Sequence, residues 1–381
     1  MIKFHFFITQ KLSILLLLFK NILLYKIITM ELIFEPILKD DIKEQEKIAT
    51  LPWIEKYRPI GLNNILSHDR IIKMLQTYIK KRSLPHLLFY GPSGTGKTST
   101  IMACARELYG KQYSHMVLEL NASDDRGIDV VRNRIRKFVM GDNVYFGKNL
   151  QDQQNIFKLV ILDETDAMTY DAQAILRKVV EKYSYNARFC LICNSNKKII
   201  PPLQSRCATY RFSPLEKNVI IGRIFEVAKL ENIYVTEKGA ELIARKSEGD
   251  MRRVLNVLQT VSMAYNEVTE NNISHCLCYP KRVDIMIILK GLMNESFEYC
   301  VLNLQKYQKN NGVSIGDIIN EFEHILRESI LEPKSVSLIS ELSIKSKAFI
   351  LDQLRIIEYN LLASTNESIQ LYGLISIFKN L

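Results

Sequence analysis

Residues 91–99 of this 381-residue chain read GPSGTGKTS, which is the complete G-x-x-x-x-G-K-[ST] spacing of a phosphate-binding loop. An apolar run ends just before the loop at Tyr90, and a helical pattern follows it to Tyr109. Backbone N–H groups between a strand and a helix can point at phosphate oxygens, and the positive end of the helix dipole reinforces them. We expect Lys97 to reach the terminal phosphates of a nucleotide and the Thr98 hydroxyl to bind Mg²⁺.

A glycine turn that happens to carry a lysine is the alternative, and the complete spacing in this context argues against it. Gly91 and Gly96 permit backbone angles that a Cβ atom forbids. The residues that we assign to nucleotide binding are Gly91, Pro92, Ser93, Gly94, Thr95, Gly96, Lys97, Thr98 and Ser99.

A second motif, KLVILDETD at 158–166, is a short apolar strand that ends in Asp163 and Glu164. Carboxylates at the carboxyl end of a buried strand lie on the ligand-binding edge of an open α/β sheet. We expect Asp163 to hold Mg²⁺ through a water molecule, and Glu164 to orient and deprotonate an attacking water. A merely solvated acidic turn is the alternative, which the nearby phosphate-binding loop disfavours.

Apolar strand patterns alternate with helical patterns from Ile60 to Phe212, which predicts an α/β domain whose parallel sheet is covered on both faces. After Phe212 the pattern is helical and no strand is expected. The expected strands lie near 85–90, 116–121, 158–163 and 188–194, and the expected helices near 97–109, 128–139 and 169–183. The expected division is an apolar leader at 1–29, a flexible acidic lead-in at 30–50, a nucleotide-binding domain at 51–212, and helical domains at 213–277 and 278–381.

The leader carries LSILLLLF, which is too short for a bilayer span of about 20 residues. Its basic start resembles a signal peptide, but no small-residue cleavage site follows. We favour the interpretation that translation starts at Met30 and that the leader is an upstream misannotation; an organellar or membrane leader is the alternative. The rest of the chain has no long apolar stretch, so we expect no membrane partner.

The net charge is +10, and four of the positive charges belong to the leader, so the excess on the remainder is mild. It permits a nucleic-acid partner without requiring one. Arg132 and Arg136 are four residues apart on one expected helix, and the next carries Arg177, which suggests a surface that follows a phosphate backbone. A solvated charged face is the alternative.

Seven cysteines are scattered along the chain, and Cys190 and Cys193 form a C-x-x-C within an expected strand. Residues three apart on a strand face opposite ways and do not converge on a metal ion. We therefore predict core thiols in a reducing compartment.

The chain contains, in this order, LPWIEKYRP, HLLFYGPSGTGKTST, ELNASDDRGID, LVILDETDAMT, CLICN, LQSRC and GDMRRVLN. In order and spacing this series resembles the small subunits of replication factor C, the clamp-loader members of the AAA+ ATPases. The resemblance is strong over residues 51–280 and weaker beyond. There STNESIQL is similar to the branch called subunit 5 in animals and subunit 3 in budding yeast.

The resemblance implies an AAA+ P-loop domain, then a helical lid domain (213–277) and an all-helical collar domain (278–381). It implies ATP and Mg²⁺ as cofactors, a nuclear location, and a hetero-pentamer with the other replication factor C subunits. The implied function is ATP binding and hydrolysis that opens the sliding clamp PCNA and loads it onto primer–template DNA in replication and repair.

The resemblance also assigns individual residues. Tyr57 and Arg58 would line the adenine end of the site, and Asn194 would sense the γ-phosphate and position water. Arg252 would contact phosphate in cis, whereas Arg206, in the SRC motif, would act in trans as an arginine finger on a neighbouring subunit's ATP. The residues that would follow the DNA backbone are Arg132, Arg136 and Arg177.

Residues 109–116, YGKQYSHM, stand where family members touch the clamp, and their aromatic side chains are expected to be exposed; a simple connecting loop is the alternative. The chain departs from the family pattern in DETD where DEAD is usual, in Ser93 where proline is common, and in a long insertion at 141–156.

Two other functions are compatible with these motifs. An ATP-binding but non-hydrolysing subunit would serve the same ring structurally and donate Arg206, although the intact Glu164 argues against it. A different AAA+ machine, such as a helicase loader or branch-migration motor, is disfavoured by the SRC motif and the helical C-terminal third.

Overall fold

The computed structural model describes residues 51–123, 128–141, 157–331, 342–363 and 366–379. The chain divides into two compact units, Met1–Arg58 and Pro59–Leu381. In the first unit, the single-turn helix α2 (Trp53–Lys56) precedes Tyr57, whose ring meets Trp53 edge-on with the centroids 6.2 Å apart. The expected leader, the acidic lead-in and residues 142–156 of the expected insertion lie outside the described residues.

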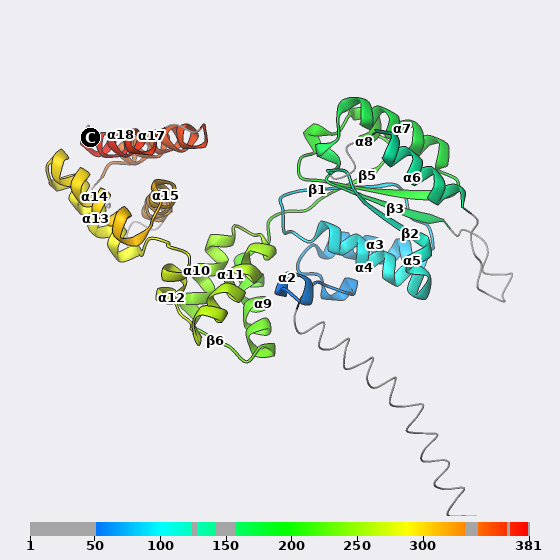
Figure 1. Cartoon of the computed structure of the whole chain (residues 1–381), viewed down its shortest axis with the longest axis horizontal. Coiled ribbons are helices and arrows are strands. Elements are labelled where there is room, and N and C mark those ends of the chain that lie inside the picture. Colours follow the sequence, from blue (N-terminus) through cyan, green and yellow to red (C-terminus); the bar gives the residue numbers. More distant parts are fainter. Residues whose placement is uncertain (1–50, 124–127, 142–156, 332–341, 364–365, 380–381) are drawn as a thin grey trace, which may run out of the picture. The chain divides into compact units, whose positions relative to one another are not determined.

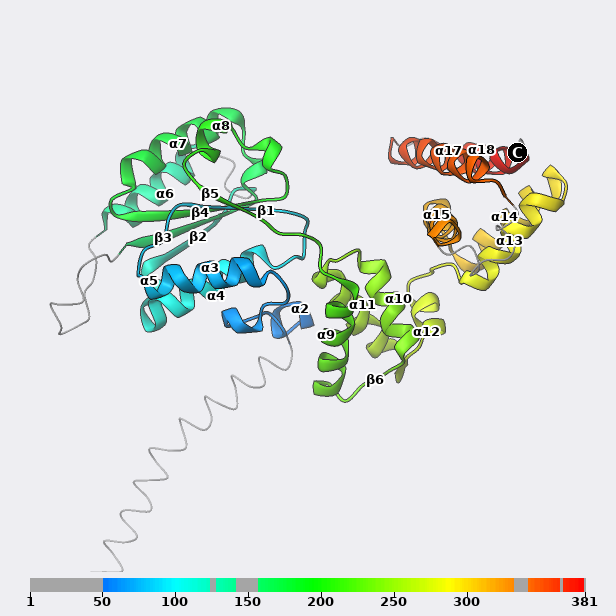
Figure 2. The ribbon, with the colours of Figure 1, turned by 180° about the vertical axis from the view of Figure 1, so that it is seen from behind.

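Among the described residues, five parallel strands form the sheet of the second unit, in the order β2-β3-β4-β1-β5 (Figure 2). The strands are β1 (Leu87–Tyr90), β2 (Val117–Asn121), β3 (Lys158–Asp163), β4 (Ala187–Cys193) and β5 (Ala208–Arg211). Because all of them run in one direction, their carboxyl ends meet at one edge of the sheet. The predicted parallel α/β architecture is confirmed, and this edge receives the loops that carry the candidate site.

Helices cover both faces of the sheet, with α3 and α4 on one side and α6, α7 and α8 on the other (Figure 1, Figure 2). These elements and the short α5 between them are α3 (Asp69–Lys80), α4 (Lys97–Tyr109), α5 (Tyr113–Met116), α6 (Ile128–Met140), α7 (Tyr170–Tyr183) and α8 (Pro201–Gln204). Strand β3 shows why both faces are covered. Its Leu159 and Ile161 belong to the core under α3 and α4, whereas Val160 and Leu162 belong to the core under α6 and α7.

The C-x-x-C cysteines lie on opposite faces of β4, as strand geometry requires. Cys190 belongs to the core under α4 and Cys193 to the core under α7. Burial raises the pKa of the Cys193 thiol to about 12, which keeps it protonated and unreactive. Across the described parts of the chain, no cluster of His, Cys, Asp and Glu is suited to holding a metal ion.

The strand predictions miss β5, which pairs with β1 and forms the edge of the sheet as far as the described residues show. Its residues alternate between half-buried and exposed, and two of the four, Thr209 and Arg211, are polar. The alternation of Ala208, Tyr210 and Phe212 toward the core of α3 and α4 was the signal for it. The expectation of no strand after Phe212 is also wrong in one detail, because the two-residue strands β6 (Tyr234–Val235) and β7 (Glu267–Val268) pair with each other.

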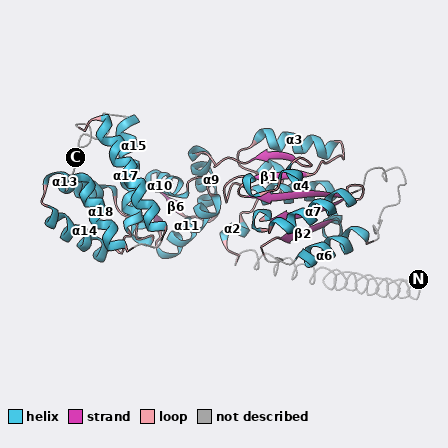
Figure 3. Ribbon diagram, turned by 90° about the horizontal axis from the view of Figure 1, so that it is seen from above, coloured by secondary structure: helices cyan, strands magenta, loops and turns pink. Residues whose placement is uncertain are grey.

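The remainder of the unit is predominantly helical. Its helices are α9 (Lys217–Leu230), α10 (Glu237–Ser247), α11 (Met251–Ala264), α12 (Glu270–Cys276), α13 (Arg282–Asn294), α14 (Phe297–Asn311), α15 (Ile315–Leu331), α17 (Ile344–Leu362) and α18 (Glu367–Lys379). Helices α13, α14, α15, α17 and α18 share an apolar core of their own, and Figure 3 shows no strand among their described residues. Among the described helices, none is long and apolar enough to cross a membrane. The boundaries at 212/213 and 277/278 stay predictions.

Candidate active site

The loop between β1 and α4 depends on glycine at defined positions. Gly94 has φ +64° and Gly96 has φ +93°, which are backbone conformations that L side chains rarely adopt. Gly91 is required by packing, because a Cβ atom there would lie 2.1 Å from the carbonyl oxygen of Phe212. The N–H of Phe212 donates in turn to the carbonyl oxygen of Tyr90 at 2.8 Å, so the chain after β5 fixes the start of the loop.

Lys97 begins α4, and only 7% of it is exposed. Its Nζ donates to the carbonyl oxygens of Gly91 at 2.7 Å and Pro92 at 2.6 Å, and to Oδ1 of Asn194 at 3.4 Å. Burial lowers the pKa of the Lys97 amine, while the Asp163 carboxylate opposes that shift. A buried ammonium that rests on the carbonyls of its own loop can exchange them for phosphate oxygens, which are stronger, charged acceptors.

Thr98 and Asp163 face each other across the site. Thr98 Oγ1 donates to Asp163 Oδ2 at 2.7 Å, and the backbone N–H of Glu164 donates to Asp163 Oδ1 at 2.8 Å. A hydroxyl and a carboxylate are hard oxygen ligands, so these residues fit Mg²⁺.

Glu164 is the residue after Asp163, and it has an exposed side chain and a left-handed backbone conformation with φ +52°. This conformation is costly for a glutamate, and such strain concentrates at functional sites.

Asp250 connects the loop to α11. The Ser93 hydroxyl donates to Asp250 Oδ2 at 2.8 Å, and the N–H of Met251 donates to the carbonyl oxygen of Gly94 at 3.1 Å. Asp250 also caps α11 by accepting from the N–H of Arg252 at 2.9 Å. Burial is the main cause of the lowered pKa of Lys97, and the positive charge of the exposed Arg252 side chain adds to that lowering.

Arg206 lies on the surface between α8 and β5. Its Nη1 donates to the carbonyl oxygen of Pro202 at 2.5 Å, and its Nη2 forms an ion pair with Oε1 of Glu181 on α7. Arg177 Nε lies 3.4 Å from the same oxygen. Glu181 Oε1 is therefore within ion-pair distance of two guanidinium groups.

The other predicted residues are not brought to the loop. Arg136 is exposed on α6, which packs against α7, so Arg136 and Arg177 come from adjacent helices on one side of the sheet. Arg132 lies on the same helix as Arg136, and its side chain is outside the described part of the structure. Tyr57 and Arg58 belong to the first unit, so their place at the adenine end stays a prediction.

Comparison with known proteins assigns both parts of the chain. Residues 87–215 match the ATPase family associated with various cellular activities (AAA), and residues 280–376 match the replication factor C C-terminal domain. Replication factor C subunit 5 of Homo sapiens is 44% identical over 344 residues, which cover 89% of this chain and 96% of that protein. The chain belongs to the small subunits of replication factor C.

Other relatives agree with this assignment. Replication factor C subunit 3 of Schizosaccharomyces pombe is 41% identical over 87% of this chain and 91% of its own length. Replication factor C subunit 3 of Oryza sativa subsp. japonica is 42% identical over 86% of each chain. These names confirm the resemblance and its branch, and with the AAA domain they make this a nucleotide-binding replication factor C subunit with a clamp-loader role.

The expectation of exposed aromatic side chains at 109–116 is wrong. The hydroxyl of Tyr109 donates to the carbonyl oxygen of Phe157 at 2.8 Å, and burial raises the pKa of that phenol. Tyr113 is half-buried, and its hydroxyl donates to Glu119. The exposed residues of the segment are Gly110, Lys111, Gln112, Ser114 and His115, which offer a polar rather than an apolar surface.

Sequence reasoning missed Gln173 and Glu181, and it missed the contact of Asp250 with the loop. Gln173 is 2% exposed, and its amide group is satisfied by backbone atoms near residues 168 and 198–200. Nε2 donates to the carbonyl oxygens of Met168 at 3.3 Å and Lys198 at 3.0 Å, while Oε1 accepts from the N–H of Ile200 at 2.9 Å. This buried amide ties α7 to the segment before α8. No local pattern marks this tie, because Lys198 and Ile200 are 25 and 27 residues away from Gln173.

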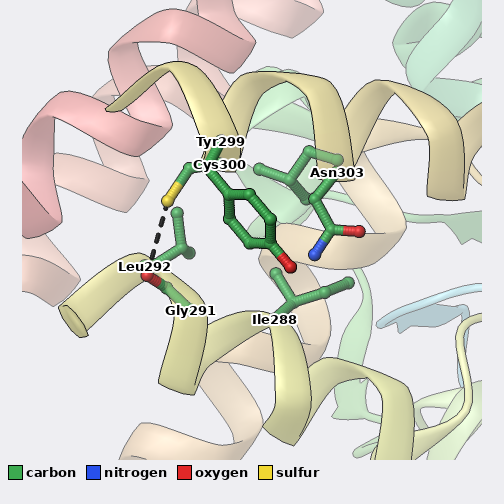
Figure 4. A pocket seen from close by; sticks show the side chains of 7 residues that line it. Ile288, Gly291, Leu292, Tyr299, Cys300 and Asn303 are labelled. Atoms are coloured by element: carbon green, nitrogen blue, oxygen red, sulfur yellow. Dashed lines mark hydrogen bonds between the residues drawn. The ribbon is translucent and has the colours of Figure 1, made fainter. Parts of the chain in front are cut away.

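A hollow between α13 and α14 is separate from these residues (Figure 4). Its lining is mostly apolar, with Tyr299 and Asn303 as polar members, and the Cys300 thiol donates to the carbonyl oxygen of Gly291 at 3.4 Å. It carries no charged side chain that could bind a phosphate.

Proposed function

We propose that this chain is an ATPase subunit of the replication factor C clamp loader, which opens the sliding clamp PCNA and loads it onto primer–template DNA in the nucleus. The observation that carries the proposal is the arrangement of Lys97, Thr98 and Asp163 at one edge of the sheet. Thr98 Oγ1 lies 2.7 Å from Asp163 Oδ2, and the buried Lys97 amine donates to the loop carbonyls and, at 3.4 Å, to Asn194 Oδ1. Family membership supports the partners, which are the other subunits of a hetero-pentamer.

The residues of the loop would bind the phosphates of ATP. Backbone N–H groups of 91–99, except at Pro92, which has none, would surround the phosphates, and Lys97 would exchange its carbonyl partners for the terminal phosphate oxygens. Thr98 would hold Mg²⁺ directly and Asp163 through a water molecule. Bound Mg²⁺ would neutralise part of the charge on the phosphates during phosphoryl transfer.

Glu164 would act in hydrolysis as the base that orients water and removes its proton. Its exposed carboxylate and strained backbone at the end of β3 support this role. Asn194 would hold the water or the terminal phosphate from the end of β4, and Arg252 would approach the phosphates from α11 in cis.

Arg206 would complete the site of a neighbouring subunit. Its position on the surface supports action in trans, where a guanidinium stabilises charge on the transferring phosphoryl group. Arg132, Arg136 and Arg177 would follow the DNA backbone. ATP can drive loading only if it favours one of two states of the assembly, so binding would favour the open-clamp state and hydrolysis would release the closed clamp.

The test is ATP-dependent loading of PCNA onto primed circular DNA by a loader reconstituted with this chain. Replacing Lys97 by Met should reduce loading by about tenfold or more, since the lysine contributes to phosphate binding and catalysis. Replacing the exposed Lys229 of α9 by Met is the matched control and should leave loading unchanged. No loading by the unmodified loader, or equal loading by the Lys97 variant, would contradict the proposal, and the second result would favour a structural subunit that donates Arg206.

A further inference from the structure

Glu181 on α7 is shared by two arginines to which the proposed function gives different tasks. Its Oε1 pairs with Nη2 of Arg206 and lies 3.4 Å from Nε of Arg177. We propose that Glu181 is a positioning residue for Arg206, and that a DNA phosphate bound at Arg177 strengthens the ion pair between Glu181 and Arg206. This inference rests on the proposed function and adds to it a physical link between DNA and a neighbouring subunit's ATP.

Glu181 holds Arg206 more firmly than it holds Arg177. Arg177 can therefore leave Glu181 and return to it. Arg206 is held at two points, by Glu181 and by the carbonyl oxygen of Pro202 at 2.5 Å. Arg177 Nε, in contrast, is buried and at ion-pair distance, without hydrogen-bond alignment to any described acceptor. An arginine that precedes its glutamate by four residues on a helix is also in the weaker orientation for such a pair.

All three side chains are accessible enough to exchange partners. Arg206 is 36% exposed, Glu181 38% and Arg177 39%, and ion pairs at such positions hold weakly. A DNA phosphate is an anion with two oxygen atoms that can accept hydrogen bonds from one guanidinium group. Arg177 would therefore leave Glu181 for the phosphate. Glu181 would then keep Arg206 as its main partner.

A better-held arginine finger needs less ordering when it meets a phosphate. A long side chain that is fixed in advance loses less conformational entropy on engagement. A guanidinium has several N–H donors, so Arg206 can stay bonded to Glu181 while others face the neighbouring nucleotide. DNA would therefore stimulate ATP hydrolysis in the neighbouring subunit without any displacement of α7.

The test measures steady-state ATP turnover by the complete loader with PCNA, in the absence and presence of primed DNA. The relevant quantity is the Arg206-dependent turnover, defined as the difference from a loader that carries Arg206→Ala. Arg177→Gln should raise this quantity in the absence of DNA about two- to fivefold, because it frees Glu181 as DNA does. In a loader that already carries Glu181→Gln, Arg177→Gln should leave the Arg206-dependent turnover in the absence of DNA unchanged.

Glu181→Gln alone should lower the Arg206-dependent turnover with DNA about three- to tenfold, while KM for ATP changes less than about twofold. A purely structural role would not change the ratio of turnover with DNA to turnover without it. The matched control is Glu226→Gln, which breaks an exposed ion pair with Arg223 on α9 (2.8 Å) and should leave both values unchanged.

Four results separate the possibilities. Unchanged DNA-free turnover in Arg177→Gln, or an equal effect with and without Glu181, would overturn the link to DNA. Unchanged turnover with DNA in Glu181→Gln would overturn the positioning role. If Arg206→Ala itself changes nothing, the trans action in the proposed function is wrong, and the inference fails with it for that distinct reason.

Discussion

Thr98 Oγ1 donates a hydrogen bond to Asp163 Oδ2 at 2.7 Å, joining the first turn of α4 to the end of β3 across 65 residues of sequence. The pair places two oxygen ligands of the kind that Mg²⁺ prefers beside the phosphate-binding loop. Thr98→Val removes the hydroxyl at nearly constant shape. It should raise the Mg²⁺ concentration needed for half-maximal ATP binding by about tenfold.

The measurement for Thr98 is a Mg²⁺ titration of ATP binding by the isolated chain. Thr98→Ser keeps the hydroxyl and serves as the control, with a requirement close to that of the unmodified chain. An unchanged Mg²⁺ requirement in Thr98→Val would show that this hydroxyl is not a ligand.

Gly91 is fixed by its contact with Phe212. A Cβ atom at Gly91 would lie 2.1 Å from the Phe212 carbonyl oxygen, and backbone cannot yield as a flexible side chain can. Gly91→Ala should destabilise the chain by about 2 kcal/mol or more and abolish ATP binding. Gly61→Ala, which meets nothing within 4 Å, should change stability by less than about 0.5 kcal/mol in the same urea unfolding experiment. Equal stability of the two variants would refute the packing argument.

The candidate DNA surface is tested by charge reversal. Arg132→Glu with Arg136→Glu should weaken DNA binding by the assembled loader for all primer sequences alike, and should make its salt dependence shallower. Backbone contacts release counterions without reading bases, which is the physical reason for both effects. The control reverses two exposed lysines of the helical region, Lys229 and Lys238, and so matches the change in charge. A loss confined to particular sequences would argue against backbone contacts.

His86 makes stability depend on pH. Its Nδ1 accepts from the N–H of Phe189 at 3.2 Å, and burial, helped by the Arg188 charge, lowers its pKa from 6.5 to about 4. The unfolded chain therefore binds the proton more readily, so stability falls as pH drops from 6.5 toward 4. We expect a loss of about 1–2 kcal/mol from this group, measured by urea unfolding at pH 7.5 and 4.5. In His86→Asn the pH dependence should be smaller; an unchanged dependence would contradict the assignment.

The sequence predicts those parts of the site whose residues are close together along the chain. The residues of 91–99 and 158–166 are contiguous, and the rule that parallel strands end at one edge is enough to bring Lys97, Asp163 and Asn194 together. The helices 97–109, 128–140 and 170–183 begin and end within a residue of their expected bounds.

What the sequence did not predict depends on contacts between distant residues. Ser93 and Asp250 are 157 residues apart, and neither carries a local signal of the other. The pairing of Glu181 with Arg206 likewise appears only when α7 and the segment after α8 are folded side by side. Strand β5 was missed since an edge strand with exposed residues has a weak apolar pattern. The inward orientation of Tyr109 follows from its bond to Phe157, 48 residues away.

The most direct test of the account is ATP turnover by the reconstituted loader, with PCNA and primed DNA, comparing the unmodified chain with Glu164→Gln. ATP binding by each chain is measured in parallel, because the substitution keeps the shape of the side chain and removes only the base. We predict a clear loss of turnover with ATP binding intact, which would make Glu164 the base of a working site. Unchanged turnover with intact binding would contradict the account and leave this chain a structural subunit whose contribution is Arg206.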